Sequence, residues 1–257
     1  QSMANLASNN ARQIYNQISG LNIYQNDDAG IQLHIGGRGL DPNRTSNFNT
    51  RQNSYDISAD VLGYPESYYT PPAEAIKEIQ IVRGAASLQY GTQFGGLINF
   101  VLKEPPNKKI DAVIRNTIGS NNQYTNFTSI GGKKNKFSFY TFYNHKRGDG
   151  FRNNSNYKSN NVYVHLKQNL SNKSELSGEV TYMNYLAKQA GGLSDRMFIN
   201  NPMQSNRSRN WFELDWLLYN FKFKHRFNEK TNLSFNLFGL DAERNTVGFR
   251  TNRVDQV

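Results

Sequence analysis

Cysteine is absent from the 257 residues, which excludes a disulfide framework and any metal or redox site built on thiolates. Hydrophobic residues make up only 37%, and no uninterrupted apolar run reaches about 18 residues, so a membrane-spanning helix is excluded. A signal peptide is also lacking, and the chain opens inside a helix-like stretch, residues 3–18. We therefore expect that the first residue is not the natural start.

The motifs of catalysis are missing too. The four histidines lie far apart and form no HExxH or other metal-binding spacing, and no GxSxG motif occurs. A Gly37-Arg38-Gly39 step begins like a dinucleotide loop, but the motif is not completed and no helix follows. We expect a protein that is not an enzyme and that holds no cofactor and no resident metal.

Aromatic side chains are abundant, with 15 Tyr and 16 Phe, and this argues against disorder in spite of the polar composition. A polar chain rich in Tyr and Phe is typical of a transmembrane β-barrel, because alternate strand residues face a wet lumen and aromatic girdles lie at both interfaces. The net charge of +10 is compatible with nucleic acid, anionic lipid headgroups or an anionic ligand. Charge alone does not choose among them.

The chain divides into two regions. Residues 1–104 mix helix-like stretches (residues 3–18 and 72–77) with short strands (21–24, 32–35, 79–82 and 97–102), which predicts a small α+β domain. Two prolines at 105–106 then mark a linker, residues 105–109. From residue 110 to 257 the pattern predicts about seven long antiparallel strands. Short polar turns (133–136, 171–174 and 228–231) alternate with long connections (145–158 and 188–215), as in outer-membrane barrels, whose short side is periplasmic. Only the first connection on the long side, residues 120–122, breaks this rule by being short.

Side-chain alternation predicts which way the strand residues face. Residues expected to face lipid are Val162, Val164, Leu166, Phe221, Phe223, Phe227, Leu233, Phe235 and Leu237. Residues expected to face inward are His165, Glu179, Lys222 and Lys224.

The segment IQIVRGAASLQYGTQFGGLINF, residues 79–100, resembles the signature that ends the plug of TonB-dependent outer-membrane receptors. Its glycines allow positive φ and close backbone approach, which a domain inside a barrel requires. Upstream, IGGRGL (35–40) resembles an Arg-Gly plug strand, and GLDPNRTS (39–46) is similar to the ferric citrate receptor branch. The Asp-Gly-Val-Pro motif of many plugs is absent, and residues 52–60 and 63–72 stand in its place.

This resemblance implies an all-β membrane protein: an N-terminal α+β plug inside a barrel of about 22 strands, of which about seven are present here. It implies import of a ferric chelate, of the ferric citrate type or another siderophore, across the bacterial outer membrane. TonB and its inner-membrane energising complex are the implied partners, with outer-membrane lipid and lipopolysaccharide around the barrel. Arg38 and Arg83 are implied to hold the plug to barrel carboxylates, with Glu179 as a possible partner.

An anionic, oxygen-rich chelate calls for arginine forks and hydrogen-bond donors. The loops expected at the plug apices, residues 41–51 and 64–71, and the long loop 189–210 carry such groups. The candidate ligand-binding residues are Arg44, Arg51, Gln52, Tyr68, Tyr69, Arg196, Arg207 and Arg209. A structural role for Arg44, such as pairing with Asp41, and a contact of the loop arginines with lipopolysaccharide phosphates are competing interpretations.

Three other functions compete with chelate import. A TonB-dependent importer of a glycan would share the fold but would present aromatic stacking platforms in place of clustered arginines. A passive porin or adhesin would need no plug signature. A nucleic-acid-binding protein is not supported, because no recognisable module for it occurs.

Overall fold

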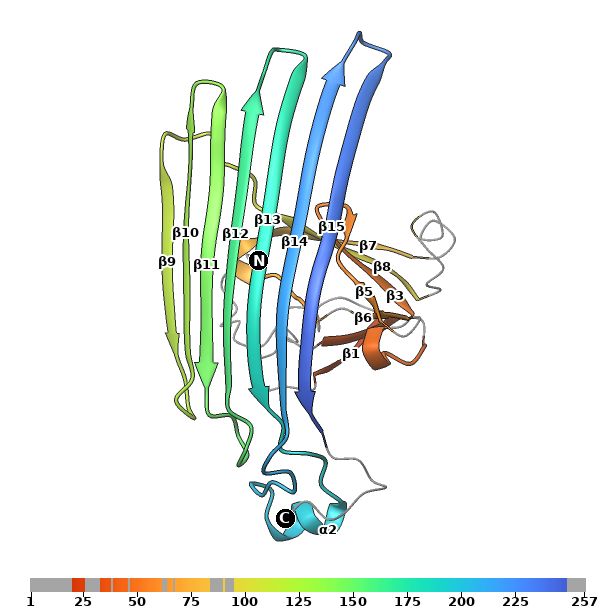
Figure 1. The fold of residues 1–257 in the computed structure, drawn as a ribbon, viewed down its shortest axis with the longest axis vertical. Helices are drawn as coiled ribbons and strands as arrows, with labels where there is room; N and C mark the ends of the chain where they lie inside the picture. Colours follow the sequence, from red (N-terminus) through yellow and green to blue (C-terminus); the bar gives the residue numbers. More distant parts are fainter. Residues whose placement is uncertain are drawn as a thin grey trace.

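The computed structural model describes residues 20–25, 33–37, 39–45, 47–61, 64–66, 68–83, 90 and 95–248. The helix expected at residues 3–18 lies outside these ranges. Figure 1 shows a tall curved sheet of long strands, with several small sheets beside one of its faces. We call the long sheet the wall and the N-terminal part of the chain the plug.

The described residues of the plug form three small sheets. An antiparallel hairpin pairs β1 (Leu21–Gln25) with β2 (Leu33–Gly37), and another pairs β5 (Ala59–Val61) with β6 (Tyr64–Glu66). The third sheet has the order β4-β3-β8-β7, in which β3 (Phe48–Gln52) runs parallel to β8 (Gly96–Leu102). Both β4 (Tyr55–Asp56) and β7 (Ile76–Val82) are antiparallel edge strands. The expected small mixed sheet is confirmed.

Strand β8 is buried on both faces for most of its length, as its nearly continuous apolar sequence requires. The helix-like stretch expected at residues 72–77 is different in the structure. A 3-10 turn, η3 (Ala73–Ala75), replaces it, and strand β7 already begins at Ile76 because its backbone pairs with Leu102 of β8. A second 3-10 turn, η2 (Asn43–Thr45), follows β2.

The wall has seven antiparallel strands in sequential order, which confirms the predicted meander. They are β9 (Asp111–Ile118), β10 (Tyr124–Lys134), β11 (Phe137–Gly148), β12 (Tyr157–Asn169), β13 (Ser174–Lys188), β14 (Trp211–Arg226) and β15 (Asn232–Val247). Among the described residues, none of the helices has the length and apolar character that a membrane crossing requires.

The long connections lie at one end of the wall and most short ones at the other (Figure 1). The connection between β9 and β10, residues 119–123, is the exception, because it is short but lies beside the long connections. We call the end with connections 135–136, 170–173 and 227–231 the turn end, and the end with connections 149–156 and 189–210 the loop end. The predicted loops were too long at both places. Strand β14 starts at Trp211, which pairs with Lys188, so the loop ends there; it also contains a short helix, α2 (Asp195–Asn200), that the sequence did not predict.

The predicted facing of the wall side chains is confirmed. Exposed residues on the outer face include Val162, Leu166, Phe221, Leu233, Phe235 and Leu237. On the inner face His165 and Glu179 are buried, and Lys222 and Lys224 line a hollow shared with the plug. The inner face is also strongly aromatic, and its fully buried rings include Phe142, Tyr163, Tyr185 and Trp216.

The proposed linker does not hang free between plug and wall. The backbone N–H of Lys133 donates to the carbonyl of Lys108 at 2.7 Å, and its Nζ donates to Asn107 at 2.9 Å. Gly131 and Gly132 of β10 make this close approach possible: a Cβ at Gly131 would lie 2.6 Å from Pro106, and one at Gly132 would lie 2.5 Å from the carbonyl oxygen of Lys109. The connection is therefore docked along β10.

One prediction follows for Gly96, the first residue of β8. Its φ is +128°, and a Cβ there would lie 2.8 Å from the carbonyl oxygen of Val82. We expect Gly96→Ala to destabilise the plug by about 1–3 kcal/mol, since both the backbone angle and the contact are unfavourable. Limited proteolysis of the complete receptor should then cut the plug faster. Gly178→Ala is the matched control, because nothing lies within 4 Å of a Cβ at Gly178; equal cutting of both variants would contradict the prediction.

Candidate functional site

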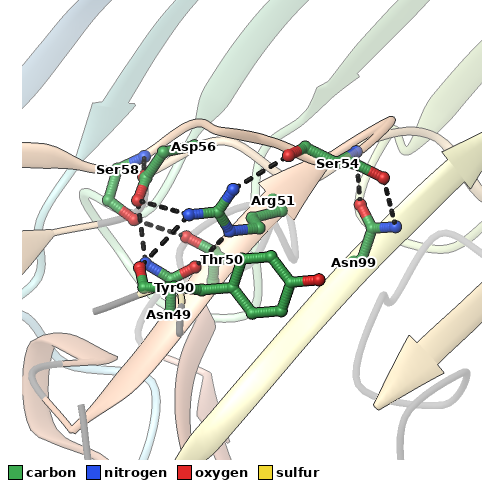
Figure 2. Close-up of polar contacts among 8 residues, drawn as sticks. All are labelled: Asn49, Thr50, Arg51, Ser54, Asp56, Ser58, Tyr90 and Asn99. Carbon is green, nitrogen blue, oxygen red and sulfur yellow. Dashed lines mark hydrogen bonds and ion pairs between the residues drawn. The ribbon is translucent and has the colours of Figure 1, made fainter. Parts of the chain in front are cut away.

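Arg51 lies on β3 and is held inside the plug (Figure 2). Its Nε donates to Asn49 at 2.8 Å, and its Nη atoms donate to the backbone carbonyls of Ser54 at 2.8 Å and Tyr90 at 3.2 Å. Its guanidinium also lies over the Tyr90 ring, 4.7 Å from the centroid, and 3.9 Å from Asp56. The side chain is only 14% exposed. Arg51 thus ties the β3–β4 turn to the segment that precedes β8.

The next two residues join the plug to the wall. Gln52 is fully buried and donates to Tyr55 at 2.7 Å and to Thr181 of β13 at 3.0 Å. Asn53 has a positive φ of 47° and donates to the Glu179 carboxylate at 2.6 Å. Its own side-chain oxygen accepts the backbone N–H of Leu102 at 2.9 Å. Asn53 therefore connects the end of β8 directly to the wall.

Glu179 is a buried carboxylate with donors from both sides of this interface. Besides Asn53 it accepts hydrogen bonds from Tyr163 at 3.0 Å and from Asn220 at 3.2 Å. Such donors are what a carboxylate needs when it leaves water. The same charge, after burial itself, helps to raise the pKa of the plug residue Tyr55, so its hydroxyl stays protonated. Glu179 is the inner-face residue that the alternation predicted, and we name its contact with Asn53 the plug latch.

Arg83, one of the two arginines implied to pair with barrel carboxylates such as Glu179, is not part of the plug latch. Arg83 is exposed, and its guanidinium lies about 3.5 Å from where a Cβ at Gly20 would be. Arg38 lies outside the described residues. A different ion pair links plug and wall, between Glu74 of η3 and Arg115 of β9 at 3.9 Å. A gating role for Arg38 and Arg83 remains a prediction.

Tyr68 meets the inner face of β14 near the loop end, whereas the Tyr69 hydroxyl faces Asn161 of β12 and Thr181 of β13. The ring of Tyr68 lies 5.5 Å from that of Phe212 and 6.1 Å from that of Trp216. Its hydroxyl accepts a hydrogen bond of 2.7 Å from Arg244 of β15. Tyr69 is buried, and burial raises the pKa of its hydroxyl. Of the two tyrosines, Tyr68 keeps a partly exposed face, and their role in lining a ligand site remains a prediction.

The long loop is braced by residues of the neighbouring loop. Arg152 donates to the carbonyls of Gln204 at 2.8 Å and Gly191 at 2.6 Å. Asn154, with φ +57°, donates to the carbonyls of Gln189 and Asn210 at 3.2 Å each and to that of Arg207. These bonds make the two loops one unit.

The candidate arginines of the loop differ in exposure. Arg196 on α2 and Arg209 are exposed, whereas Arg207 is half-buried and donates to the carbonyl of Asn206 at 2.8 Å. Arg44 lies in η2, and its side chain is outside the described set. The structure therefore separates the candidates into a loop group, a plug-interior group (Arg51, Gln52 and Tyr69) and Tyr68 between them.

A hollow of about 240 Å³ lies between plug and wall toward the turn end. Its lining is rich in charge, and Lys167 pairs there with Glu175 at 2.9 Å and Glu104 at 3.7 Å. In the part of the chain that the structure describes, no group of three His, Asp or Glu side chains could hold a metal ion. The hollow is polar, and it lies on the side where the plug meets its connection to β9.

Three important residues were missed by sequence reasoning. Asn53 and Arg152 gave no signal, because their partners are far away in the sequence and lie in segments that looked unrelated. Arg244 gave a weak signal. Continuing the alternation of β15 past Leu237 would have placed it on the inner face, with Phe238 and Leu240.

Residues 1–97 match the model of the TonB-dependent Receptor Plug Domain family. No curated protein matches the sequence. The structure of the ferric citrate transporter FecA in the unliganded form superposes with a TM-score of 0.81 at 22% identity, over 91% of this chain and 37% of that one.

Two further structures show how widely the fold is shared. The siderophore receptor PirA from Pseudomonas aeruginosa has a TM-score of 0.67 at 15% identity, with 93% of this chain and 38% of that chain covered. The ferripyoverdine receptor of the outer membrane of Pseudomonas aeruginosa, bound to ferripyoverdine, has a TM-score of 0.70 at 16% identity, with coverage of 86% and 30%. This chain thus spans less than two-fifths of each receptor, and the matched proteins are receptors and transporters, not enzymes. Residues 1–97 are therefore similar to the TonB-dependent Receptor Plug Domain family, and the described part of the chain has the fold of the plug and part of the barrel of the TonB-dependent outer-membrane receptors.

Proposed function

We propose that the complete protein imports a ferric chelate across the bacterial outer membrane, with energy delivered by TonB and its inner-membrane complex. The observation that carries this proposal is the match of residues 1–97 to the plug family, together with a wall that holds the plug. We place the loop end on the extracellular side of the outer membrane and the turn end on the periplasmic side, because long connections in such barrels are extracellular. Lipid and lipopolysaccharide surround the outer face.

For the ligand we propose an anionic, oxygen-rich chelate of the ferric citrate type. The loop end presents Arg196 and Arg209 to solvent, and Arg244 lies beside Tyr68 on the inner face below them. Guanidinium forks suit carboxylate oxygens, and an intact chelate needs no metal ligands from the protein. We assign Arg44, Arg196, Arg207, Arg209 and Tyr68 to direct contact. Arg51, Gln52 and Tyr69 lie inside the plug, where they set the position of the contacting groups.

The ligand assignment can be tested with a loop arginine. Arg209→Glu should weaken binding of ferric citrate to the complete receptor by about tenfold to a hundredfold, while Arg209→Lys should weaken it less, because a charge-assisted hydrogen bond contributes about 1.5–3 kcal/mol. Arg209 is a cleaner choice than Arg51, since Arg51→Glu would also break the contacts of Arg51 with Asn49 and Ser54. Quenching of intrinsic fluorescence on titration with the chelate gives the affinity.

Lys173→Glu is the matched control, because it makes the same charge reversal in an exposed turn at the opposite end of the wall. Normal ferric citrate binding by Arg209→Glu would contradict the anionic-chelate assignment and leave the import assignment intact. Binding of a neutral oligosaccharide in place of the chelate would favour the glycan importer.

The plug latch gives a test of how the plug is held in the barrel. Transport through a filled barrel requires that the plug moves, and Asn53 bonds the plug to Glu179. We expect Asn53→Asp to repel Glu179 and loosen the plug, so that cells carrying the receptor become sensitive to a bulky antibiotic that normally cannot cross the outer membrane.

A second substitution serves as the control, because it restores one carboxylate and one amide to the plug latch. Adding Glu179→Gln to Asn53→Asp exchanges donor and acceptor and should recover most of the barrier. Asn53→Gly, which keeps the positive φ of 47° but removes the side chain, should have an intermediate effect. If Asn53→Asp leaves antibiotic resistance and chelate uptake unchanged, the plug latch does not hold the plug.

A further inference from the structure

A row of polar side chains crosses the outer face of the wall. Directly paired residues on the seven strands form it, and each belongs to the face that also carries the exposed apolar side chains. The row consists of Asn116, Asn126, His145, Asn160, Asn184, Asp215 and Glu243. A sheet face that contacts only acyl chains would not carry such a row, because each polar group would lose its hydration.

The members of the row are bonded to one another and to tyrosines. Asn126 donates to Asn116 at 2.8 Å, and Asn184 donates to Asp215 at 3.1 Å. The hydroxyl of Tyr143 donates to Asn160 at 2.8 Å. Tyrosines with polar partners mark the level at which a membrane protein passes from acyl chains to headgroups. The row therefore marks the headgroup level on the extracellular side.

Two cations face each other one step beyond this row. Arg147 of β11 and Lys158 of β12 are directly paired, and both are exposed on the outer face. Like charges in such a pair repel. Their paired neighbours on the flanking strands are Tyr124 and Leu186, which carry no charge, and the Arg147 guanidinium lies 5.6 Å from the Tyr124 ring centroid. An anion between the two cations would turn the repulsion into binding.

The space for such an anion is present. A hollow of about 580 Å³ opens between the β9–β10 and β11–β12 connections, with Ile118, Tyr124, Arg147 and Lys158 in its lining. Asn122 and Asp149 also line it, and there the Asn122 amide donates to the Asp149 carboxylate at 2.5 Å. Beneath it on the same face of β12 follow Val162 and Leu166, both exposed and apolar. A molecule held here would have an anionic head at the cations and apolar chains against the wall.

We propose that this hollow binds the phosphorylated sugar headgroup of an outer-leaflet glycolipid. Arg147 and Lys158 hold the phosphate, the Tyr124 ring packs against the sugar, and the acyl chains lie on the apolar face below. Continuity with the apolar face favours a lipid over a soluble anion. The inference depends on the outer-membrane fold and not on the identity of the imported chelate, so the two can fail separately.

The test uses the complete receptor, purified in detergent and stripped of lipid. Purified lipopolysaccharide, its dephosphorylated form and inorganic phosphate are titrated separately, and the melting temperature and the lipid retained in native mass spectrometry are measured. We expect lipopolysaccharide to raise the melting temperature of the wild type. Arg147→Ala combined with Lys158→Ala should lower its affinity at least about tenfold, since two charge-assisted contacts are lost.

Lys134→Ala with Lys173→Ala is the matched control, because it removes two exposed cations at the turn end and should leave lipid affinity unchanged. Arg147→Lys should retain most of the binding. An unchanged melting temperature without lipid, together with normal chelate binding, shows that the double variant is folded. Unchanged lipopolysaccharide affinity in the Arg147/Lys158 variant, equal binding of the dephosphorylated lipid, or an equal effect of inorganic phosphate would overturn the proposal.

Discussion

Side-chain alternation in the wall is the constraint on which the rest of the structure depends. Each residue that faces the plug is flanked by two that face the other way, so one sequence must satisfy two surroundings at once. On β12, Val162 and Leu166 are exposed, while Tyr163 and His165, which lie between them in the sequence, are buried. The inner face can therefore be aromatic and polar without any loss of the apolar outer face, and a register slip of one residue would exchange the two.

The contact between plug and wall combines tight packing with a small number of specific polar bonds. Tyr68 packs against Phe212 and Trp216, and Tyr55 lies 5.8 Å from Phe238. Close-packed rings resist displacement, because a shift leaves voids or clashes. The bonds of Glu179 add a polar constraint, because a buried carboxylate that loses a donor is left with an uncompensated charge. Aromatic packing and the bond between Asn53 and Glu179 therefore define the position of the plug together.

The sequence predicted what depends on short-range patterns: seven alternating strands, the facing of Val162 or Glu179, the two ends of the wall and the glycine-rich plug signature. It misjudged elements whose limits depend on pairing, such as the start of β14 at Trp211 and of β7 at Ile76. The contacts within the candidate site were harder to predict from the sequence. Arg51 was recognisable as an important cation, but its partners Asn49, Ser54 and Tyr90 are set by the fold. The bracing by Arg152 depends on two loops that meet only in three dimensions.

The docked connection between plug and wall limits how far the C-terminal end of the plug can travel. Residues 106–109 lie along β10 at Gly131 and Gly132, and only residues 103–105 separate that contact from the end of β8. Three extended residues reach about 10 Å at about 3.3–3.6 Å each. The C-terminal end of the plug can therefore move only a short distance from β10. A force applied from the N-terminal side would first extend or unfold the N-terminal strands of the plug, because β8 stays beside the wall until residues 106–109 detach from β10.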